Sequence, residues 1–67
     1  MNQQTVDFGY EVGEEEMVRL QLLKGVQEAI RVGNVVNLYY EYPPAKHEKD
    51  ALEKELRKNG GRIVAEI

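Results

Sequence analysis

Side chains that carry enzyme chemistry are scarce in this 67-residue chain. It has no serine and no cysteine, and Thr5 is its one aliphatic hydroxyl. Catalysis by Ser–His–Asp or Cys–His groups is therefore excluded, because the nucleophile is missing. The single histidine, His47, opens the segment HEKDA, in which Ala51 stands where a zinc-protease helix needs its second histidine. We therefore predict no metal site and no bound cofactor.

Neither the glycines nor the clustered acids of this sequence indicate a catalytic site. The segment KNGGRI leads from a predicted helix into a predicted strand, whereas a phosphate loop leads from a strand into a helix. Glu14, Glu15 and Glu16 are consecutive, so on a helix they fan around the axis and do not converge on a substrate. The sequence therefore predicts a protein that is not an enzyme.

Three of the four tyrosines fall within the stretch VVNLYYEYPP. Alternate side chains of a strand point to opposite faces of its sheet. Tyr40 and Tyr42 then share the apolar face, where we interpret them as core or core-rim residues. Tyr39 points to the opposite face, where Val35 and Val64 are predicted beside it. We interpret these three as a small protein contact, with an exposed tyrosine of no consequence as the equal alternative.

Hydrophobic periodicity divides the chain into five elements that must position these residues. We predict strands over 5–12, 34–42 and 62–67, and helices over 13–33 and 45–61. The longer helix is predicted from apolar residues at helical spacing: Val18, Leu22, Val26, Ala29 and Ile30. The shorter helix is predicted to end in a left-handed cap at the Asn-Gly-Gly segment.

The predicted elements assemble into one small α/β domain, residues 1–67. All three strands alternate in polarity, so both helices should cover the same side of the sheet. Right-handed crossovers then favour a largely parallel sheet in the order 1-2-3. The predicted fold is a two-layer β-α-β-α-β sandwich with a three-stranded sheet and both helices on one face. The alternative is a mixed sheet whose first or last strand runs antiparallel.

The excess of acidic over basic residues makes nucleic acid a less favoured partner than protein. Twelve acids against nine bases give a net charge of −3, whereas a phosphate-backbone binder usually carries a basic surface. The acids Glu14, Glu15 and Glu16, with Met17 and Leu20 beside them, predict an acidic and partly apolar patch suited to docking on a basic protein. Alternatively, Met17 and Leu20 cover the margin of a small core.

We therefore expect a small non-enzymatic protein-binding module, a regulator or inhibitor that acts as a homodimer through its open sheet face or an edge strand. A nucleic-acid-binding domain is the alternative, with a base stacked on Tyr39. Its phosphates would lie near Lys46, Lys49, Arg57, Lys58 and Arg62. No apolar run is long enough to span a membrane, and the absence of cysteine fits a cytoplasmic location.

Overall fold

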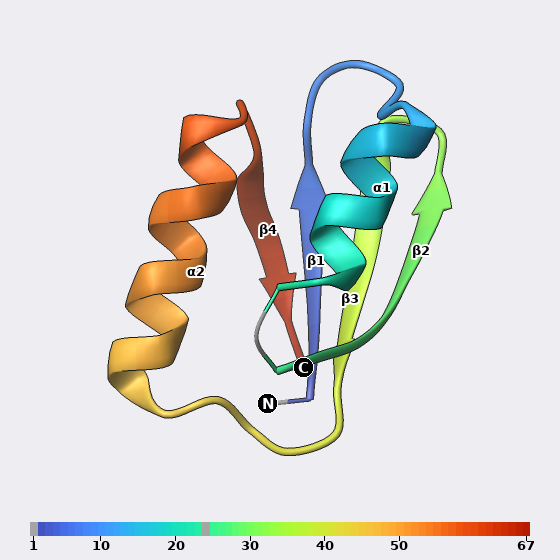
Figure 1. Ribbon diagram of the computed structural model, residues 1–67. Helices are drawn as coiled ribbons and strands as arrows, with labels where there is room; N and C mark the ends of the chain where they lie inside the picture. Colours follow the sequence, from blue (N-terminus) through green and yellow to red (C-terminus); the bar gives the residue numbers. More distant parts are fainter. Residues whose placement is uncertain (1, 24) are drawn as a thin grey trace.

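Two helices and four strands make up the computed structural model, which describes residues 2–23 and 25–67. The elements are β1 (Gln3–Asp7), α1 (Glu14–Gln21), β2 (Val26–Val32), β3 (Val35–Tyr40), α2 (Lys46–Lys58) and β4 (Arg62–Glu66). The strands form one antiparallel sheet in the order β2-β3-β1-β4 (Figure 1). This β-α-β-β-α-β order is the split β-α-β, or ferredoxin-like, arrangement.

The predicted three-stranded, largely parallel sheet is wrong, and so is the mixed-sheet alternative. The cause lies in residues 26–32, which form the strand β2 and not the second half of a long helix. The first helix ends at Gln21, and residue 24, inside the predicted helix, lies outside the described residues. An extra strand reverses the chain direction, so that β1 lies between β3 and β4 and runs antiparallel to both.

A two-residue turn joins β2 to β3 and explains why the chain reverses there. Val32 pairs directly with Val35 across the turn, and Gly33 has a φ of +63°. A positive φ at the first central residue is the geometry of a type II′ hairpin turn, which glycine adopts without strain. Gly33 was predicted to end a helix, but it starts this turn.

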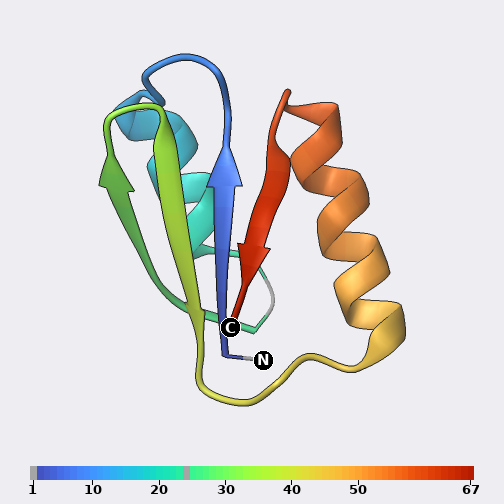
Figure 2. The same cartoon turned by 180° about the vertical axis from the view of Figure 1, so that it is seen from behind.

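Both helices cover the same face of the sheet, which is the part of the predicted architecture that the structure retains (Figures 1 and 2). α2 ends as predicted in a left-handed cap. The Gly60 amide donates to the Arg57 carbonyl at 3.0 Å, the Gly61 amide donates to the Leu56 carbonyl at 2.7 Å, and Gly60 has a φ of +85°. This Schellman pattern satisfies the last carbonyl groups of the helix and turns the chain directly into β4.

The core lies between the helices and the inner face of the sheet. Its fully buried side chains include Val6 of β1 and both Val36 and Leu38 of β3. Tyr40 belongs to this core as predicted, but Tyr42 is 75% exposed. The core prediction for Tyr42 is wrong because β3 ends at Tyr40, so the alternation of the strand does not extend that far.

A chain of polar contacts crosses the core and joins four elements. The Tyr40 hydroxyl donates to the side-chain oxygen of Gln4, which is fully buried. The Gln4 side-chain amide donates to Glu66 at 3.3 Å, and the Lys49 ammonium donates to the same carboxylate at 2.8 Å. Among the described residues, every buried side-chain nitrogen or oxygen has a hydrogen-bond partner. This series of hydrogen bonds therefore links β3, β1, β4 and α2 and leaves none of its buried polar groups unsatisfied.

An irregularity in β4 turns Glu66 toward this polar chain. Thr5 pairs with Ala65 and Val6 pairs with Ile63, so Val64 is an extra residue on β4. Such a β-bulge shifts the alternation of every residue beyond it. Unbroken alternation from Ile63 would point Ala65 inward and Glu66 outward, and the bulge reverses both.

The pair between Lys49 and Glu66 makes stability depend on pH. The hydrogen bond from Lys49 is the main cause that lowers the pKa of Glu66 in the folded state. A lowered pKa contributes stability above the ordinary carboxyl range, and this contribution is lost as the pH falls through the folded-state pKa. Glu66→Gln is therefore expected to reduce the free energy of unfolding at pH 7 and to make a smaller difference at about pH 2, below the ordinary carboxyl range.

Urea denaturation followed by circular dichroism between these two pH values measures the difference. Glu53→Gln is the matched control, because Glu53 pairs with the exposed Arg57 at 3.1 Å on the surface of α2. Exposed pairs of this kind contribute little to stability. A difference between Glu66→Gln and the unmodified chain that persists unchanged at about pH 2 would contradict the role assigned to the ion pair.

Candidate functional site

Neither helix covers the face of the sheet that is turned away from α1 and α2 (Figure 2). We call it the open face. Its side chains alternate with the buried ones along β1 and β3. By register, the open face comprises Glu28, Ile30 and Val32 of β2, Val35, Asn37 and Tyr39 of β3, Gln3, Thr5 and Asp7 of β1, and Arg62, Val64 and Ala65 of β4.

Apolar side chains gather on the half of the open face formed by β2 and β3. Ile30 and Val32 of β2 are 41% and 62% exposed. Val35 is the direct cross-strand partner of Val32, and Tyr39 lies diagonally from Ile30. We call Ile30, Val32, Val35 and Tyr39 the apolar strip. Asn37 lies opposite Ile30 and between Val35 and Tyr39, and Glu28 lies opposite Tyr39, so the strip is a small apolar patch with polar side chains among its members.

Polar side chains occupy the neighbouring part of the open face. The Thr5 hydroxyl donates to the side-chain oxygen of Asn37 at 2.8 Å, which fixes both groups at the centre of the sheet. Asp7 accepts a hydrogen bond from the Gly9 amide at 2.9 Å and stands opposite Arg62 in the register. The open face is therefore divided into the apolar strip over β2 and β3 and a polar region over β1.

Two of the predicted open-face residues lie together, and the third lies apart. Tyr39 and Val35 belong to the apolar strip, where both are half-buried. Val64 is exposed, but it lies on β4, and β1 separates that strand from β3. The single contact predicted from Tyr39, Val35 and Val64 is thus split. The residues that do lie beside Tyr39 and Val35 are Ile30 and Val32 of β2, which the sequence periodicity had assigned to a helix.

The predicted docking patch at the start of α1 is wrong in its apolar part. Met17 and Leu20 are only 7% and 5% exposed and belong to the core, as the alternative interpretation held. Val18 and Leu22, predicted to be buried, are exposed instead. The buried face of the predicted helix was chosen to include Val26, Ala29 and Ile30, which are not helical. The prediction therefore turned the wrong side of α1 toward the core.

The acids of the predicted patch hold α1 in place. Glu14 pairs with Arg31 of β2 at 3.1 Å, and Arg31 also donates to the carbonyl of Val12. Glu16 accepts a hydrogen bond from the Tyr10 hydroxyl at 2.8 Å, and this bond raises the pKa of Tyr10. Glu15 is exposed. Two of the three predicted acids therefore already have intramolecular partners.

The basic residues predicted to hold phosphates are not brought together with Tyr39. Lys46, Lys49, Arg57 and Lys58 all belong to α2, on the helix-covered side of the sheet. Arg62 is the member of the set that belongs to the open face, where it stands opposite Asp7. A nucleic acid stacked on Tyr39 would therefore meet one of these cations, whereas base-stacking sheets usually carry a basic surround.

The described residues contain neither a group of metal-ligating side chains nor a helix that could span a membrane. His47 is exposed on the first turn of α2, and residues 2–23 and 25–67 contain no group of three side chains placed to ligate a metal. Within the same residues, neither helix is long and apolar enough to cross a bilayer.

Comparison with known proteins gives no assignment. No protein-family model, curated protein or solved structure matches this chain. The split β-α-β arrangement occurs with many unrelated functions, so the arrangement does not assign one either. The function must be argued from the surfaces of the molecule.

Proposed function

We propose that this chain is a small non-enzymatic protein-binding module that acts as a homodimer through its open face. The observation that carries the proposal is the apolar strip. Ile30 and Val32 are exposed to solvent next to Val35 and the ring of Tyr39, on a face that neither helix covers. An exposed apolar patch is typical of a protein contact, and tyrosine is enriched in such contacts.

In the proposed dimer, the open faces of two copies pack against each other. Two sheets pack about 10 Å apart with their inner side chains interdigitated. A two-fold axis over β2 and β3 places each apolar strip against its copy and leaves Asp7 and Arg62 at the polar rim. Four strands about 4.8 Å apart and about 17 Å long give a face of about 19 by 17 Å. That area is well below the about 800 Å² per partner of a standard interface, so we expect weak association, with a dissociation constant in the micromolar range or above.

The edges of the sheet support this choice of surface over strand pairing. β4 carries a bulge at Val64, and β2 has an irregularity between Val26 and Glu28. Bulges at sheet edges interrupt the regular row of amide and carbonyl groups that an added strand needs. The open face is therefore the better dimer surface.

The proposed role as a regulator or inhibitor is based on the small size of the chain and on the reactive side chains that it lacks. The chain has neither serine nor cysteine, and its acids do not converge on one point, so we propose that it acts by occupying a surface of another protein, as a regulator or inhibitor does. The absence of cysteine supports a reducing compartment, and we propose the cytoplasm. Cell fractionation with an antibody against the chain tests that location.

Ile30→Lys is expected to convert the dimer to a monomer without unfolding it. The substitution places a charge in the middle of the apolar strip, where the dimer would bury it without a partner. In the monomer the lysine remains in water, because Ile30 is already 41% exposed. We expect the dissociation constant to rise at least tenfold, measured by sedimentation equilibrium from about 1 to 500 μM.

Val18→Lys is the matched control, because Val18 is also an exposed apolar residue but lies on α1. It is expected to leave the dissociation constant unchanged. Tyr39→Ala should weaken association and spare the fold, whereas Tyr40→Ala should mainly destabilise the fold. A chain that stays monomeric up to about 500 μM, or equal effects of the two lysine substitutions, would overturn the proposed dimer.

A further inference from the structure

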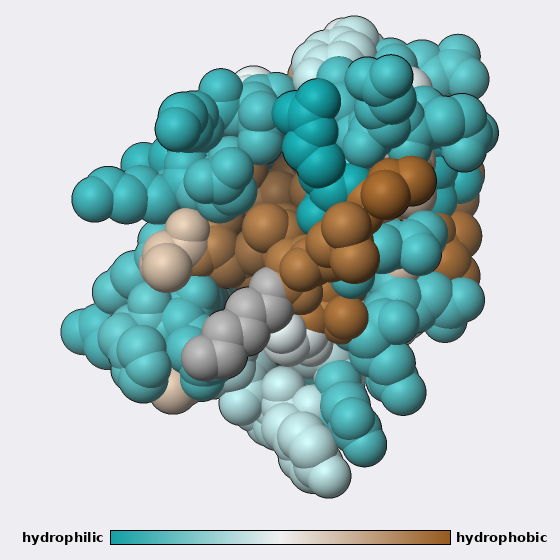
Figure 3. All heavy atoms as spheres, in the orientation of Figure 1, coloured by the Kyte–Doolittle hydropathy of each residue, from teal (hydrophilic) through white to brown (hydrophobic). Residues whose placement is uncertain are grey.

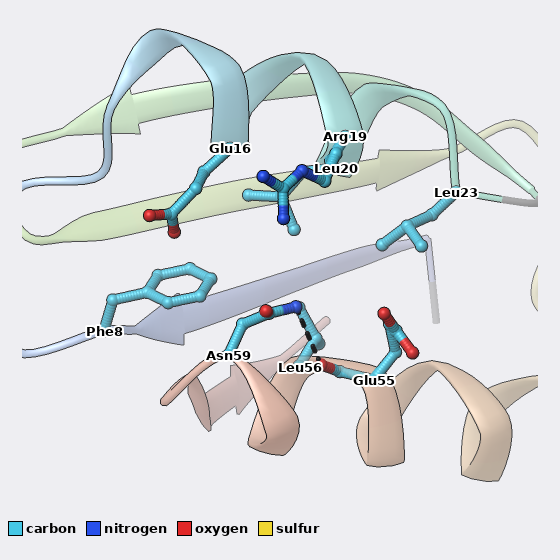
Figure 4. Close-up of a pocket in the computed structure, with 8 residues that line it drawn as sticks. All are labelled: Phe8, Glu16, Arg19, Leu20, Leu23, Glu55, Leu56 and Asn59. Atoms are coloured by element: carbon cyan, nitrogen blue, oxygen red, sulfur yellow. Dashed lines mark hydrogen bonds between the residues drawn. The ribbon is translucent and has the colours of Figure 1, made fainter.

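A groove separates α1 from α2 on the helix-covered side of the molecule. Figure 3 shows apolar surface between the two helices, and Figure 4 shows side chains of both helices pointing into the space between them. Phe8, Leu20 and Leu56 form the floor, and Leu23 follows from the loop after α1. The groove differs from the open face in position and in composition, so it is a second and independent surface.

One end of the groove is closed by Tyr10. Its hydroxyl lies 2.8 Å from a carboxylate oxygen of Glu16 on α1 and 3.2 Å from the carbonyl oxygen of Asn59 at the end of α2. The hydroxyl has one proton for these two oxygens, and through it Tyr10 links the start of α1 to the end of α2. The walls of the groove are therefore positioned before any partner arrives, which lowers the entropy lost on binding.

The other end of the groove opens into a hollow of about 390 Å³. Leu23, Ala51 and Leu52 supply its apolar lining, and His47 stands at its margin. This volume is in the range of small-molecule pockets and holds one large apolar side chain with room around it. The hollow is the natural anchor point for a partner that lies along the groove.

Acidic side chains flank the hollow along α2. Glu48 and Glu55 also line it, seven residues apart and therefore on the same side of the helix. The residues between them on that side are Ala51 and Leu52, so α2 presents an acid, an apolar pair and an acid in turn. Among the described residues, neither glutamate takes part in an ion pair, although Glu48 accepts the Ala45 amide at 3.3 Å. Glu16 and Arg19 of α1 also line the groove, so acids outnumber arginine along it by three to one. This pattern complements an apolar side chain flanked by cations.

A second copy of the chain does not fit this pattern. Its exposed apolar residues near a helix are Val18 of α1 and Leu22 directly after α1, and Glu15 lies one turn before Val18 on the same side of the helix. Docking them in the hollow would bring Glu15 toward Glu48 and Glu55. Like charges at an interface are unfavourable, so the occupant must be a different and basic segment.

We propose that the groove between α1 and α2 binds a basic amphipathic helix of a partner protein, whose apolar anchor fills the hollow lined by Leu23, Ala51 and Leu52. Cations about one turn before and after the anchor meet Glu48 and Glu55. The space between the helices beside Asn59 is only about 30 Å³, so the partner helix lies over the rim there and enters the groove at the hollow. The α2 wall from His47 to Asn59 is about 18 Å long, the length of about three helical turns. Helix-in-groove recognition uses this combination of an apolar anchor and a charged margin.

Helical peptides of about 15 residues test the proposal by titration into the isotope-labelled protein at low salt. The probe carries Leu, Phe or Trp as the anchor, with Lys four residues before and three residues after it. The matched probe carries Glu at those two positions. We expect the basic peptide to bind at least about fivefold more tightly and to shift the amide resonances of Leu23, Ala51 and Glu55.

Substitutions in the protein identify the site. Glu48→Gln and Glu55→Gln are each expected to weaken binding about two- to fivefold. Asp50→Asn removes the same charge from α2 away from the hollow and is expected to change nothing. The monomeric Ile30→Lys variant should bind as well as the unmodified chain, so this inference stands or fails independently of the proposed dimer.

Three outcomes would overturn the inference. The first is that no basic peptide binds, whichever anchor it carries. The second is that the acidic peptide binds equally well. The third is that the resonance shifts fall on the open face around Tyr39 and leave those of Ala51 and Leu52 unchanged.

Discussion

Gly61→Ala is expected to lower the free energy of unfolding by about 1–3 kcal/mol, a large part of the about 3–5 kcal/mol that a domain of this size has. Gly61 is buried where α2 turns into β4. A Cβ atom there would lie 2.8 Å from the ring of Phe8, 2.9 Å from Val6 and 3.0 Å from the backbone carbonyl oxygen of Leu56. That carbonyl already accepts the Gly61 amide, so it cannot withdraw without breaking the helix cap.

Thermal unfolding followed by circular dichroism measures the effect. Gly13→Ala is the control, because Gly13 has an ordinary φ of −77° and no atom would lie within 4 Å of its new Cβ. We expect it to change stability by less than about 0.5 kcal/mol. If Gly61→Ala proved as stable as Gly13→Ala, the close approach of α2 to β1 would be wrong, and with it the position of one wall of the groove.

Periodicity predicted the shorter helix and its cap but failed for residues 26–32. Val26, Ala29 and Ile30 fit the spacing of a helix face, and a short apolar segment of this kind does not distinguish a helix from a strand. The irregularity between Val26 and Glu28 hides the alternation that would have revealed a strand. The turn signal was present in the sequence, because Gly33-Asn34 lies between β-branched residues, as in a hairpin.

The assignment of residues 26–32 to a helix caused most of the error in the predicted fold. With β2 read as helix, the chain has three strands joined by two helices, and right-handed crossovers make such a sheet parallel. With β2 as a strand, a hairpin reverses the chain and the whole sheet becomes antiparallel. Alternation within β3 was unaffected, so the opposite orientations of Tyr39 and Tyr40 were predictable from the sequence alone.

The candidate surfaces were predictable only where they depend on a single strand. Tyr39 and Val35 follow from the alternation of β3, whereas Ile30 and Val32 join them only through the pairing of β2 with β3. The groove depends on where two helices lie on the sheet. Leu23 and Leu52 are 29 residues apart in the sequence, and no local pattern places them around one hollow.

Gln4→Leu is expected to lower the free energy of unfolding by about 1–3 kcal/mol, although it makes the core more apolar. Gln4 is fully buried and accepts the hydrogen bond of the Tyr40 hydroxyl. Burial raises the pKa of Tyr40, so this hydroxyl stays protonated and needs an acceptor. Leucine has about the same size as glutamine but leaves that hydroxyl without a partner inside the core.

The double variant Gln4→Leu with Tyr40→Phe separates this explanation from a simple packing defect. Tyr40→Phe alone leaves the side-chain oxygen of Gln4 without its donor, so we expect it too to be destabilising. Removing both groups leaves no unsatisfied pair, and the double variant should be more stable than the sum of the two single effects predicts by about 1 kcal/mol or more. Urea denaturation of the four proteins completes the cycle. Additive effects would mean that Tyr40 and Gln4 are not coupled, and that the register of β1 against β3 is held by backbone pairing and apolar contacts alone.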